Sequence, residues 1–167
     1  MVTQSFKDNV VNRGISGDKV HVITNGVNQE IFYPKEKNQE LINKYNLQDK
    51  FVISYVGAHG ISQNLSTILE VAKKLSTNKN IEFVFVGEGA EKDKLKQIVR
   101  EEELANVQFI DAQPKEIIPE FYNSSDLCLI PLKNIELFKT FIPSKMFEIM
   151  ACGVSFVASL QGEAAQI

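Results

Sequence analysis

From Phe51 onward the sequence alternates between short apolar segments and amphipathic helical segments. Segments 51–56 and 81–86 are almost continuously apolar, as strands are when helices cover both faces of a parallel sheet. A glycine follows each of them directly, at Gly57 and at Gly87, where the chain has to turn. Strands that alternate with helices form right-handed βαβ units, so the predicted fold class is α/β, with a Rossmann-like doubly wound parallel sheet.

The same pattern sets the bounds of the expected elements. Strands are predicted at 51–56, 81–86, 107–110, 127–130 and 155–158, and helices at 3–13, 40–45, 64–75, 91–102, 117–123 and 143–152. The alternating segment 19–24 predicts one more short strand, ahead of the Asn25-Gly26 turn. Another helix is expected soon after 155–158, so we expect this chain to be part of a longer protein.

The overall composition is that of one globular domain. A chain of 167 residues with 44% hydrophobic and 23% charged residues is long enough to bury a sizeable core. Its net charge of −3 leaves no electrostatic footprint for nucleic acid, so no such partner is expected. Cys128 and Cys152 suggest no disulfide framework, and no segment approaches the roughly 20 apolar residues of a membrane span. The expected location is the cytoplasm, with association at the inner face of the membrane left open.

One segment near the C-terminus combines a loop, a helix and a glycine stop. Pro143 suits the first helical position, where a missing N–H costs nothing. Gly153 suits the left-handed residue that follows a helix end. Phe147, Met150 and Ala151 are spaced i, i+3 and i+4, so they are predicted to form the apolar face of this helix.

Lys145 and Glu148 share a different face of the same helix. A helix N-terminus with a lysine in its first turn is suited to phosphate, because free N–H groups and the helix dipole both favour an anion. A glutamate one turn further along could accept hydrogen bonds from sugar hydroxyls. The alternative is a solvated lysine–glutamate pair worth about 0.2–0.5 kcal/mol. The pattern alone leaves both interpretations open.

Small and polar residues follow the first two strands of the regular region. Gly57 and Gly60 would let the backbone approach a phosphate ahead of a helix N-terminus. His59 stands where the dinucleotide fingerprint needs its second glycine, which argues against nicotinamide binding. Glu88 lies where a dinucleotide fold has its ribose-binding acid, so that alternative stays open. We interpret His59 as a hydrogen-bonding group of its loop rather than a catalyst, and no Cys/His cluster has metal-ligand spacing.

Five motifs follow one another along the chain. They are Ile23-Thr24-Asn25-Gly26-Val27-Asn28 with Phe32 and Pro34, Tyr55-Val56-Gly57, Phe85-Val86-Gly87-Glu88-Gly89, Ser125-Asp126-Leu127, and Glu148-Ile149-Met150-Ala151-Cys152-Gly153. In this order they resemble glycosyltransferase family four over nearly the whole chain. The resemblance implies the C-terminal, donor-binding domain of a GT-B enzyme. Residues 1–34 would be an entry segment packed on the domain, and 35–167 the Rossmann-like nucleotide-sugar-binding domain.

The sequence departs from this family at two places. Glu148 matches the second glutamate of the family's E-x7-E motif, which binds the nucleotide ribose, but Thr140 stands where the first glutamate would be. Ala58 and Gln63 stand where the family has a basic pair that binds the diphosphate. The Pro143-Ser144-Lys145 variant nevertheless resembles a bacterial subgroup that builds capsule or O-antigen polysaccharide.

The resemblance therefore implies a site assembled from several loops. Lys145, His59 and backbone amides would replace the basic pair at the diphosphate, and loop 112–114 would contact the base. The candidate donor-binding residues are Gly57, His59, Gly60, Glu88, Gln113, Pro114, Pro143, Ser144, Lys145 and Glu148. No catalytic residue is assigned, and the donor is expected to bind without a metal ion or a further cofactor, since fixed dipoles and a lysine can stabilise the departing diphosphate.

The resulting hypothesis is the donor-binding domain of a retaining glycosyltransferase, which moves a sugar from a UDP-linked donor to a polysaccharide or lipid-linked acceptor. Acceptor contacts would come from an N-terminal domain outside these residues, so the isolated chain is expected to bind donor without transferring sugar. Two alternatives remain, a nicotinamide-dinucleotide-binding Rossmann domain and a non-catalytic fragment or partner domain. A free sheet edge would also leave self-association open.

Overall fold

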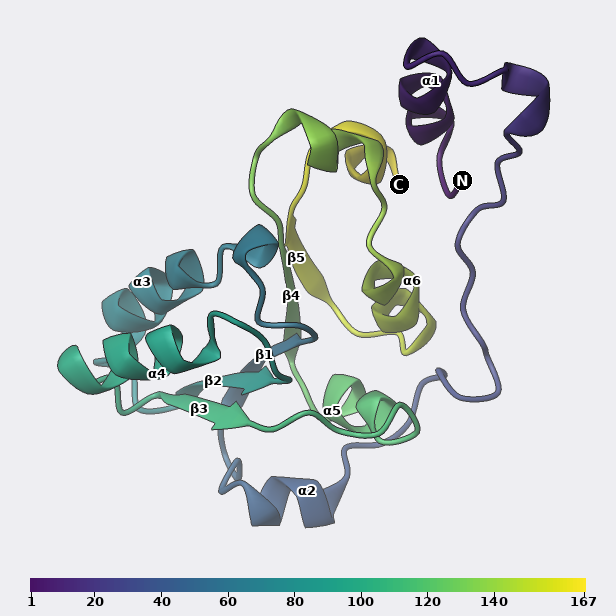
Figure 1. Cartoon of the computed structure of the whole chain (residues 1–167). Helices are drawn as coiled ribbons and strands as arrows, with labels where there is room; N and C mark the ends of the chain where they lie inside the picture. The colour runs from purple at the N-terminus through teal and green to yellow at the C-terminus, as the bar shows by residue number, and fades with distance from the viewer.

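The computed structural model describes all 167 residues. Its centre is a five-stranded sheet with the strand order β3-β2-β1-β4-β5 (Figure 1). The strands are β1 (Phe51–Val56), β2 (Ile81–Val86), β3 (Val107–Ile110), β4 (Leu127–Pro131) and β5 (Phe156–Ser159). Every neighbouring pair is parallel. The chain moves outward from β1 on one side and then resumes on the other, so the predicted doubly wound sheet is confirmed.

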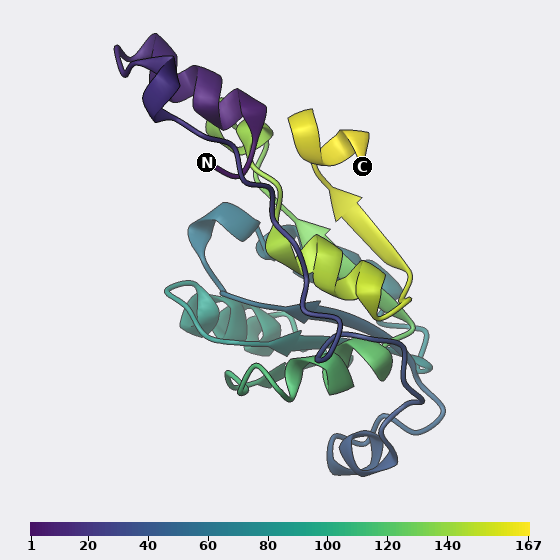
Figure 2. The ribbon, with the colours of Figure 1, turned by 90° about the vertical axis from the view of Figure 1, so that its right-hand side faces the viewer.

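Helices cover both faces of the sheet (Figure 2). The six α-helices are α1 (Gln4–Asn12), α2 (Gln39–Lys44), α3 (Ser66–Leu75), α4 (Lys92–Glu101), α5 (Ile118–Asn123) and α6 (Ser144–Ala151). Side chains of α3 and α4 share one core with Tyr55 and Phe85, whereas those of α5 and α6 share the other core with Val56 and Val86. Because β1 and β2 contribute side chains to both cores, their sequences are almost continuously apolar rather than alternating. None of the helices is long and apolar enough to cross a membrane.

The N-terminal segment contributes no strand to the sheet. Thr3 caps α1, and its hydroxyl oxygen accepts a hydrogen bond from the N–H of Phe6 at 3.1 Å. The predicted strand 19–24 is wrong, because part of it is in a short 3-10 helix (Gly17–Lys19) and the rest has no sheet neighbour. Ile23 is 76% exposed there. An alternating pattern indicates a strand only where a neighbouring strand can pair with it.

The helix α6 differs from its prediction in which face is buried. It begins at Ser144, with Pro143 as the residue before it in extended conformation, and Gly153 follows it with the expected positive φ of 69°. Met146 and Ile149 face the core, whereas Met150 is 46% exposed. The predicted face is therefore only partly right: Ala151 packs against the core and Phe147 is half-buried, but Met150 is exposed. The apolar residues of α6 cover more than half of its circumference, so spacing alone did not select the buried stripe.

Candidate functional site

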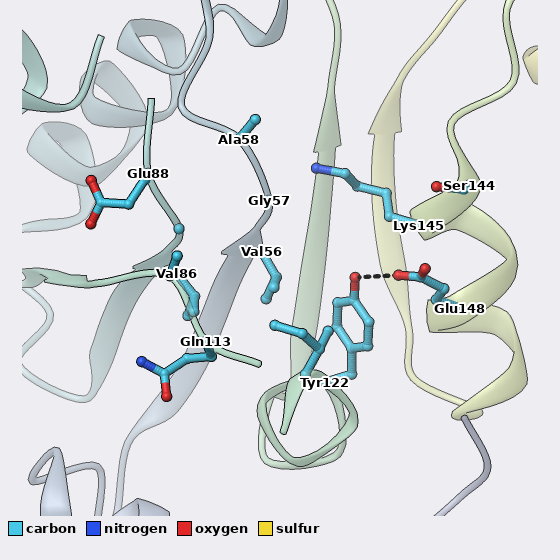
Figure 3. A pocket seen from close by; sticks show the side chains of 13 residues that line it. Val56, Gly57, Ala58, Val86, Glu88, Gln113, Tyr122, Ser144, Lys145 and Glu148 are labelled. Atoms are coloured by element: carbon cyan, nitrogen blue, oxygen red, sulfur yellow. Dashed lines mark hydrogen bonds between the residues drawn. The ribbon is translucent and has the colours of Figure 1, made fainter. Parts of the chain in front are cut away.

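A cavity of about 410 Å³ lies at the carboxyl ends of β1 and β2, facing α6 (Figure 3). In a doubly wound sheet, ligands bind outside the strand ends where the strand order reverses, which here is between β1 and β4. The lining residues are Val56, Gly57, Ala58, Val86, Gly87, Glu88, Ala112, Gln113, Ile118, Tyr122, Ser144, Lys145 and Glu148. Six of the ten candidate residues are among them, namely Gly57, Glu88, Gln113, Ser144, Lys145 and Glu148.

Two glycines bring the strand ends close together on one side of the cavity. Gly57 and Gly87 adopt φ angles of 142° and 141°, in a region that side-chain-bearing residues rarely occupy. A Cβ atom added at Gly87 would collide with the carbonyl group of Gly57. A Cβ atom at Gly57 would lie 2.5 Å from the Nζ atom of Lys145. The cavity therefore depends on glycine at both positions.

The side chain of Lys145 crosses from α6 toward the end of β1 (Figure 3). Its ammonium group forms no ion pair, since no carboxylate oxygen lies within 4.0 Å of Nζ. Nζ instead lies over the ring of Tyr55, 4.1 Å from the ring centroid. Burial lowers the pKa of Lys145 to about 8, although the negative charge of Glu148 opposes this. An unpaired cation at the N-terminus of α6 has the charge and the position that suit an anion.

The carboxylate of Glu148 is held by a residue that the sequence did not single out. The Tyr122 hydroxyl, from α5, donates a hydrogen bond to Glu148 Oε2 at 3.1 Å (Figure 3). Tyr122 is 2% exposed, and burial raises the pKa of its hydroxyl, with the charge of Glu148 adding to the effect. The phenol therefore stays protonated as a donor. One oxygen of Glu148 is fixed in this way, and the carboxylate keeps acceptor capacity toward the cavity.

Glu88, on the opposite side of the cavity, belongs to an ion-pair cluster. Lys92 Nζ, at the start of α4, lies 2.5 Å from Glu88 Oε1 and 2.7 Å from Asp111 Oδ1. Burial alone would lower the pKa of Lys92, but the hydrogen bonds and charges of Asp111 and Glu88 outweigh it, so its pKa is raised. Glu88 is thus partnered by an ammonium group. This arrangement weakens the dinucleotide hypothesis, which needed Glu88 to bind ribose.

His59 does not line the cavity, so its expected contact with a diphosphate is wrong for this structure. Its ring is 0% exposed and packs against the rings of Tyr55, Phe85 and Phe109, at centroid distances of 5.8, 6.2 and 6.0 Å. Neither ring nitrogen has a hydrogen-bond partner. Burial, together with the charge of Lys92, lowers the pKa of His59 to about 4, so the ring is neutral at pH 7. The main-chain groups of His59 hold the loop, because its N–H donates to the Glu88 carbonyl at 2.7 Å.

Of the remaining candidate residues, some line the cavity and others do not. Gln113 lines the cavity, and its Nε2 atom donates to the carbonyl of Asp111 at 3.0 Å. Gly60, Pro114 and Pro143 are not among the lining residues. Pro143 is buried directly before α6. No group of three or more His, Cys, Asp or Glu side chains is placed to hold a metal ion.

The polar lining distinguishes this cavity from a second one of similar size. A space of about 390 Å³ between α3 and β4 is lined by apolar and small polar residues, with no ionisable side chain among them. The cavity at the strand ends combines a lone cation, a fixed carboxylate and a glycine-rich backbone. This combination suits a ligand with an anionic group and neighbouring hydroxyls, such as a phosphorylated nucleoside.

The fold is that of a Rossmann-like domain with a polar cavity at the carboxyl ends of its strands. Comparison with known families is more specific, because the family model of the group 1 glycosyl transferases matches residues 37–167. The chain belongs to this family. The resemblance seen in the sequence is thereby confirmed, and the fold is that of the C-terminal half of a GT-B glycosyltransferase.

Individual relatives are more distant. The chain is 25% identical, over 96% of its length, to WcaI of Escherichia coli K12, which is named as a colanic acid biosynthesis glycosyl transferase. Among solved structures it resembles WaaG, a glycosyltransferase involved in lipopolysaccharide biosynthesis, with a TM-score of 0.81 and 15% identity over its whole length. It also resembles Anabaena HepE in complex with UDP-glucose, with a TM-score of 0.79 and 17% identity over 98% of its length. The chain spans 40% of WcaI and 45% of WaaG and of HepE.

Proposed function

We propose that the cavity binds the nucleoside diphosphate of a sugar donor, with UDP as the nucleotide. The observation that carries this proposal is the ammonium group of Lys145, which has no carboxylate partner and points from the N-terminus of α6 toward Gly57. A diphosphate would supply the missing negative charge. The first N–H groups of α6 lack intrahelical partners and would add hydrogen bonds to the same anion.

The remaining lining residues suit the rest of a nucleotide. Glu148, held by Tyr122, would accept hydrogen bonds from the ribose hydroxyls, the role that the family resemblance implies for this glutamate. Ala112 and Gln113 lie on the loop after β3 and would contact the base. UDP is favoured among nucleotides because the similar HepE was crystallised with UDP-glucose and with UDP.

The proposed reaction breaks the bond between the anomeric carbon of the sugar and a diphosphate oxygen. Negative charge then builds up on the departing diphosphate, and Lys145 and the N-terminus of α6 would stabilise it. The new glycosidic bond forms to an acceptor hydroxyl, whose proton leaves with the released nucleotide or a nearby base. We infer retention of the anomeric configuration from the family resemblance alone. In this scheme the donor needs no metal ion.

The proposed acceptor is a growing cell-surface polysaccharide or its lipid-linked precursor. The named roles of WcaI in colanic acid biosynthesis and of WaaG in lipopolysaccharide biosynthesis support this class of acceptor. Acceptor contacts would come from a second domain facing the cavity. We therefore expect these residues alone to bind donor without transferring sugar, and rapid sugar transfer by the isolated chain would contradict this part of the proposal.

Thermal unfolding with added nucleotides tests the binding step. UDP or UDP-N-acetylglucosamine at about 100 times its dissociation constant should add roughly 2.7 kcal/mol of stability in the presence of EDTA. That corresponds to a rise of several degrees in Tm for a domain of this size. GDP should give a smaller shift and NADH none. At the same ligand concentration the shift should be reduced by about half or more in Glu148→Gln and Lys145→Met. It should persist unchanged in Lys74→Met, whose exposed lysine forms no ion pair. A shift with NADH alone, or with none of the ligands, would overturn the proposal.

A further inference from the structure

The contact between Lys145 and Tyr55 joins the two faces of the sheet. The ring of Tyr55 belongs to the core under α3 and α4, whereas Lys145 comes from α6 on the other face. Nζ of Lys145 lies 4.1 Å from the centre of that ring. The lysine side chain therefore reaches over the carboxyl edge of β1, and it ends on an aromatic face rather than on a carboxylate. A cation in this position is attracted by the electron-rich face of the ring.

The ring of Tyr55 is fixed from several directions. It is 1% exposed and packs against the rings of His59 and Phe85, with centroids 5.8 and 6.3 Å away. Its hydroxyl donates a hydrogen bond to the carbonyl of Ala58 at 2.7 Å. Because both the ring and the hydroxyl group are held, the aromatic face of Tyr55 has a fixed position. A lysine that rests on it has fewer conformations than a free lysine on a helix surface.

Gly57 makes room for this contact. Its missing Cβ would lie 2.5 Å from Nζ and 3.3 Å from Cε of Lys145, and 3.4 Å from the hydroxyl of Tyr55. Any side chain at this position would thus displace the ammonium group from the ring. The same glycine lines the cavity. The ammonium group is therefore held at the cavity wall, at the place where a diphosphate would have to come.

We propose that Tyr55 is a positioning residue: its aromatic face holds the ammonium group of Lys145 at the cavity wall, ready for an incoming diphosphate. This inference rests on the proposed function, since it concerns the same site. It assigns Tyr55 no contact with the substrate. Tyr55 acts through Lys145, by removing part of the entropy loss that a mobile lysine would suffer when it binds phosphate.

Lysine-selective NMR of the full chain tests the contact without any ligand. Methylene protons above an aromatic ring experience its ring current, so the ε-CH₂ resonance of Lys145 should be shifted upfield from those of the other lysines. The shift should remain in Tyr55→Phe, which keeps the ring, and vanish in Tyr55→Leu. Lys145→Met identifies the resonance. An unshifted Lys145 resonance in the wild-type chain would overturn the inference.

Calorimetric titration with UDP tests the expected effect of Tyr55 on UDP affinity. Tyr55→Leu should weaken UDP binding about three- to tenfold, and Tyr55→Phe should restore most of it. Tyr45→Leu is the matched control, since the ring of Tyr45 lies 5.1 Å from Lys44 Nζ, at the C-terminal end of α2 and outside the cavity. In a Lys145→Met background, Tyr55→Leu should have no further effect.

The outcomes separate the two proposals. If the wild-type chain binds UDP, but Tyr55→Leu binds it equally well or weakens it equally in the Lys145→Met background, only the role of Tyr55 is overturned. If the wild-type chain binds no UDP, the proposed function fails and the role of Tyr55 fails with it, whatever the NMR experiment shows about the contact.

Discussion

Helices α4 and α6 each carry a lysine in the first turn, and both helices begin at the carboxyl ends of the strands. The two lysines differ in their partners. Lys92 is 4% exposed and lies between Glu88 and Asp111, with a raised pKa. Lys145 has no ion-pair partner, and burial lowers its pKa to about 8. Both helix N-termini favour anions through their dipoles. At α4 the protein itself supplies those anions, whereas at α6 it does not.

This difference shows why only one of the two helix ends is a candidate ligand site. Two carboxylates surround one ammonium group at α4, so the local charge is negative and would repel a phosphate. At α6 the nearest carboxylate, Glu148, is engaged by the hydroxyl of Tyr122 and lies beyond ion-pair distance from Lys145. A lysine in the first turn of a helix thus indicates an anion site only where its charge is left uncompensated.

The largest expected effect is on Lys145. Replacing it in Lys145→Met should weaken UDP binding about 10- to 100-fold, because a charge-assisted hydrogen bond is worth about 1.5–3 kcal/mol. The same variant should unfold at a higher temperature at pH 7. Burial lowers the folded-state pKa of Lys145 to about 8, well below the ordinary value of a lysine, so the charged lysine costs stability below pH 8. The gain is roughly 1–3 kcal/mol. Calorimetric titration measures the loss of affinity, and thermal unfolding measures the gain in stability. Normal UDP binding by Lys145→Met would contradict the role assigned to Lys145.

Lys92→Met should have the reverse effects: folding stability should fall, whereas UDP affinity should change little. Removing this lysine leaves two uncompensated carboxylates and should destabilise the fold by about 1–3 kcal/mol, less than a fully buried pair because Glu88 and Asp111 are exposed. UDP affinity should fall only a few-fold, through the freed charge of Glu88 at the cavity. Chemical denaturation and titration of the same sample separate the two quantities. If UDP binding were lost while stability stayed unchanged, the roles assigned to the two lysines would have to be exchanged.

The pH dependence of UDP binding should report Lys145 alone. The free protein loses the proton of Lys145 as the pH rises through about 8, whereas the raised pKa of Lys92 keeps that lysine charged. UDP affinity should therefore be nearly constant from pH 7 to 8 and then fall by about tenfold per pH unit. Titrations at pH 7, 8 and 9 measure this. An affinity that is flat from pH 7 to pH 9 would mean that the charge of Lys145 does not contribute.

The smallest expected effect concerns the hydrogen bond to Glu148. Tyr122→Phe removes the donor but keeps the ring in the core, so UDP affinity should fall about two- to fivefold, in line with about 0.5–1 kcal/mol for one neutral donor. Deoxy-UDP, which lacks one ribose hydroxyl, serves as a second probe. The loss in Tyr122→Phe should be smaller for deoxy-UDP than for UDP. Equal losses for both nucleotides would place the role of Tyr122 away from the ribose.

Most of the fold could be predicted from the sequence because it depends on local patterns. Segments 51–56, 81–86 and 107–110 match their strands. The strand β4 is one residue longer than predicted, and β5 is shifted by one residue. Alternation of strands and helices then leaves few topologies. The segment 19–24 failed for the complementary reason, since its pattern is that of a strand but the sheet offers it no neighbour.

The site was only partly predictable because its geometry depends on contacts between distant elements. Lys145 and Glu148 share one helix face, so spacing alone placed them together. Tyr122 was missed because its partner, Glu148, lies 26 residues away. Lys92 was missed although Glu88 is only four residues from it, and its second partner, Asp111, lies 19 residues away. The burial of His59 follows from Phe109 and Gly89, which pack against it. No local signal could have indicated that contact.

A crystal structure of the chain soaked with UDP in the presence of EDTA tests the central claim most directly. The account predicts the diphosphate within about 3 Å of Lys145 Nζ, at the N-terminus of α6. It also predicts the ribose hydroxyls at the carboxylate of Glu148 and the base beside Gln113. UDP bound elsewhere, or bound in the cavity with Lys145 turned away from its phosphates, would contradict the account.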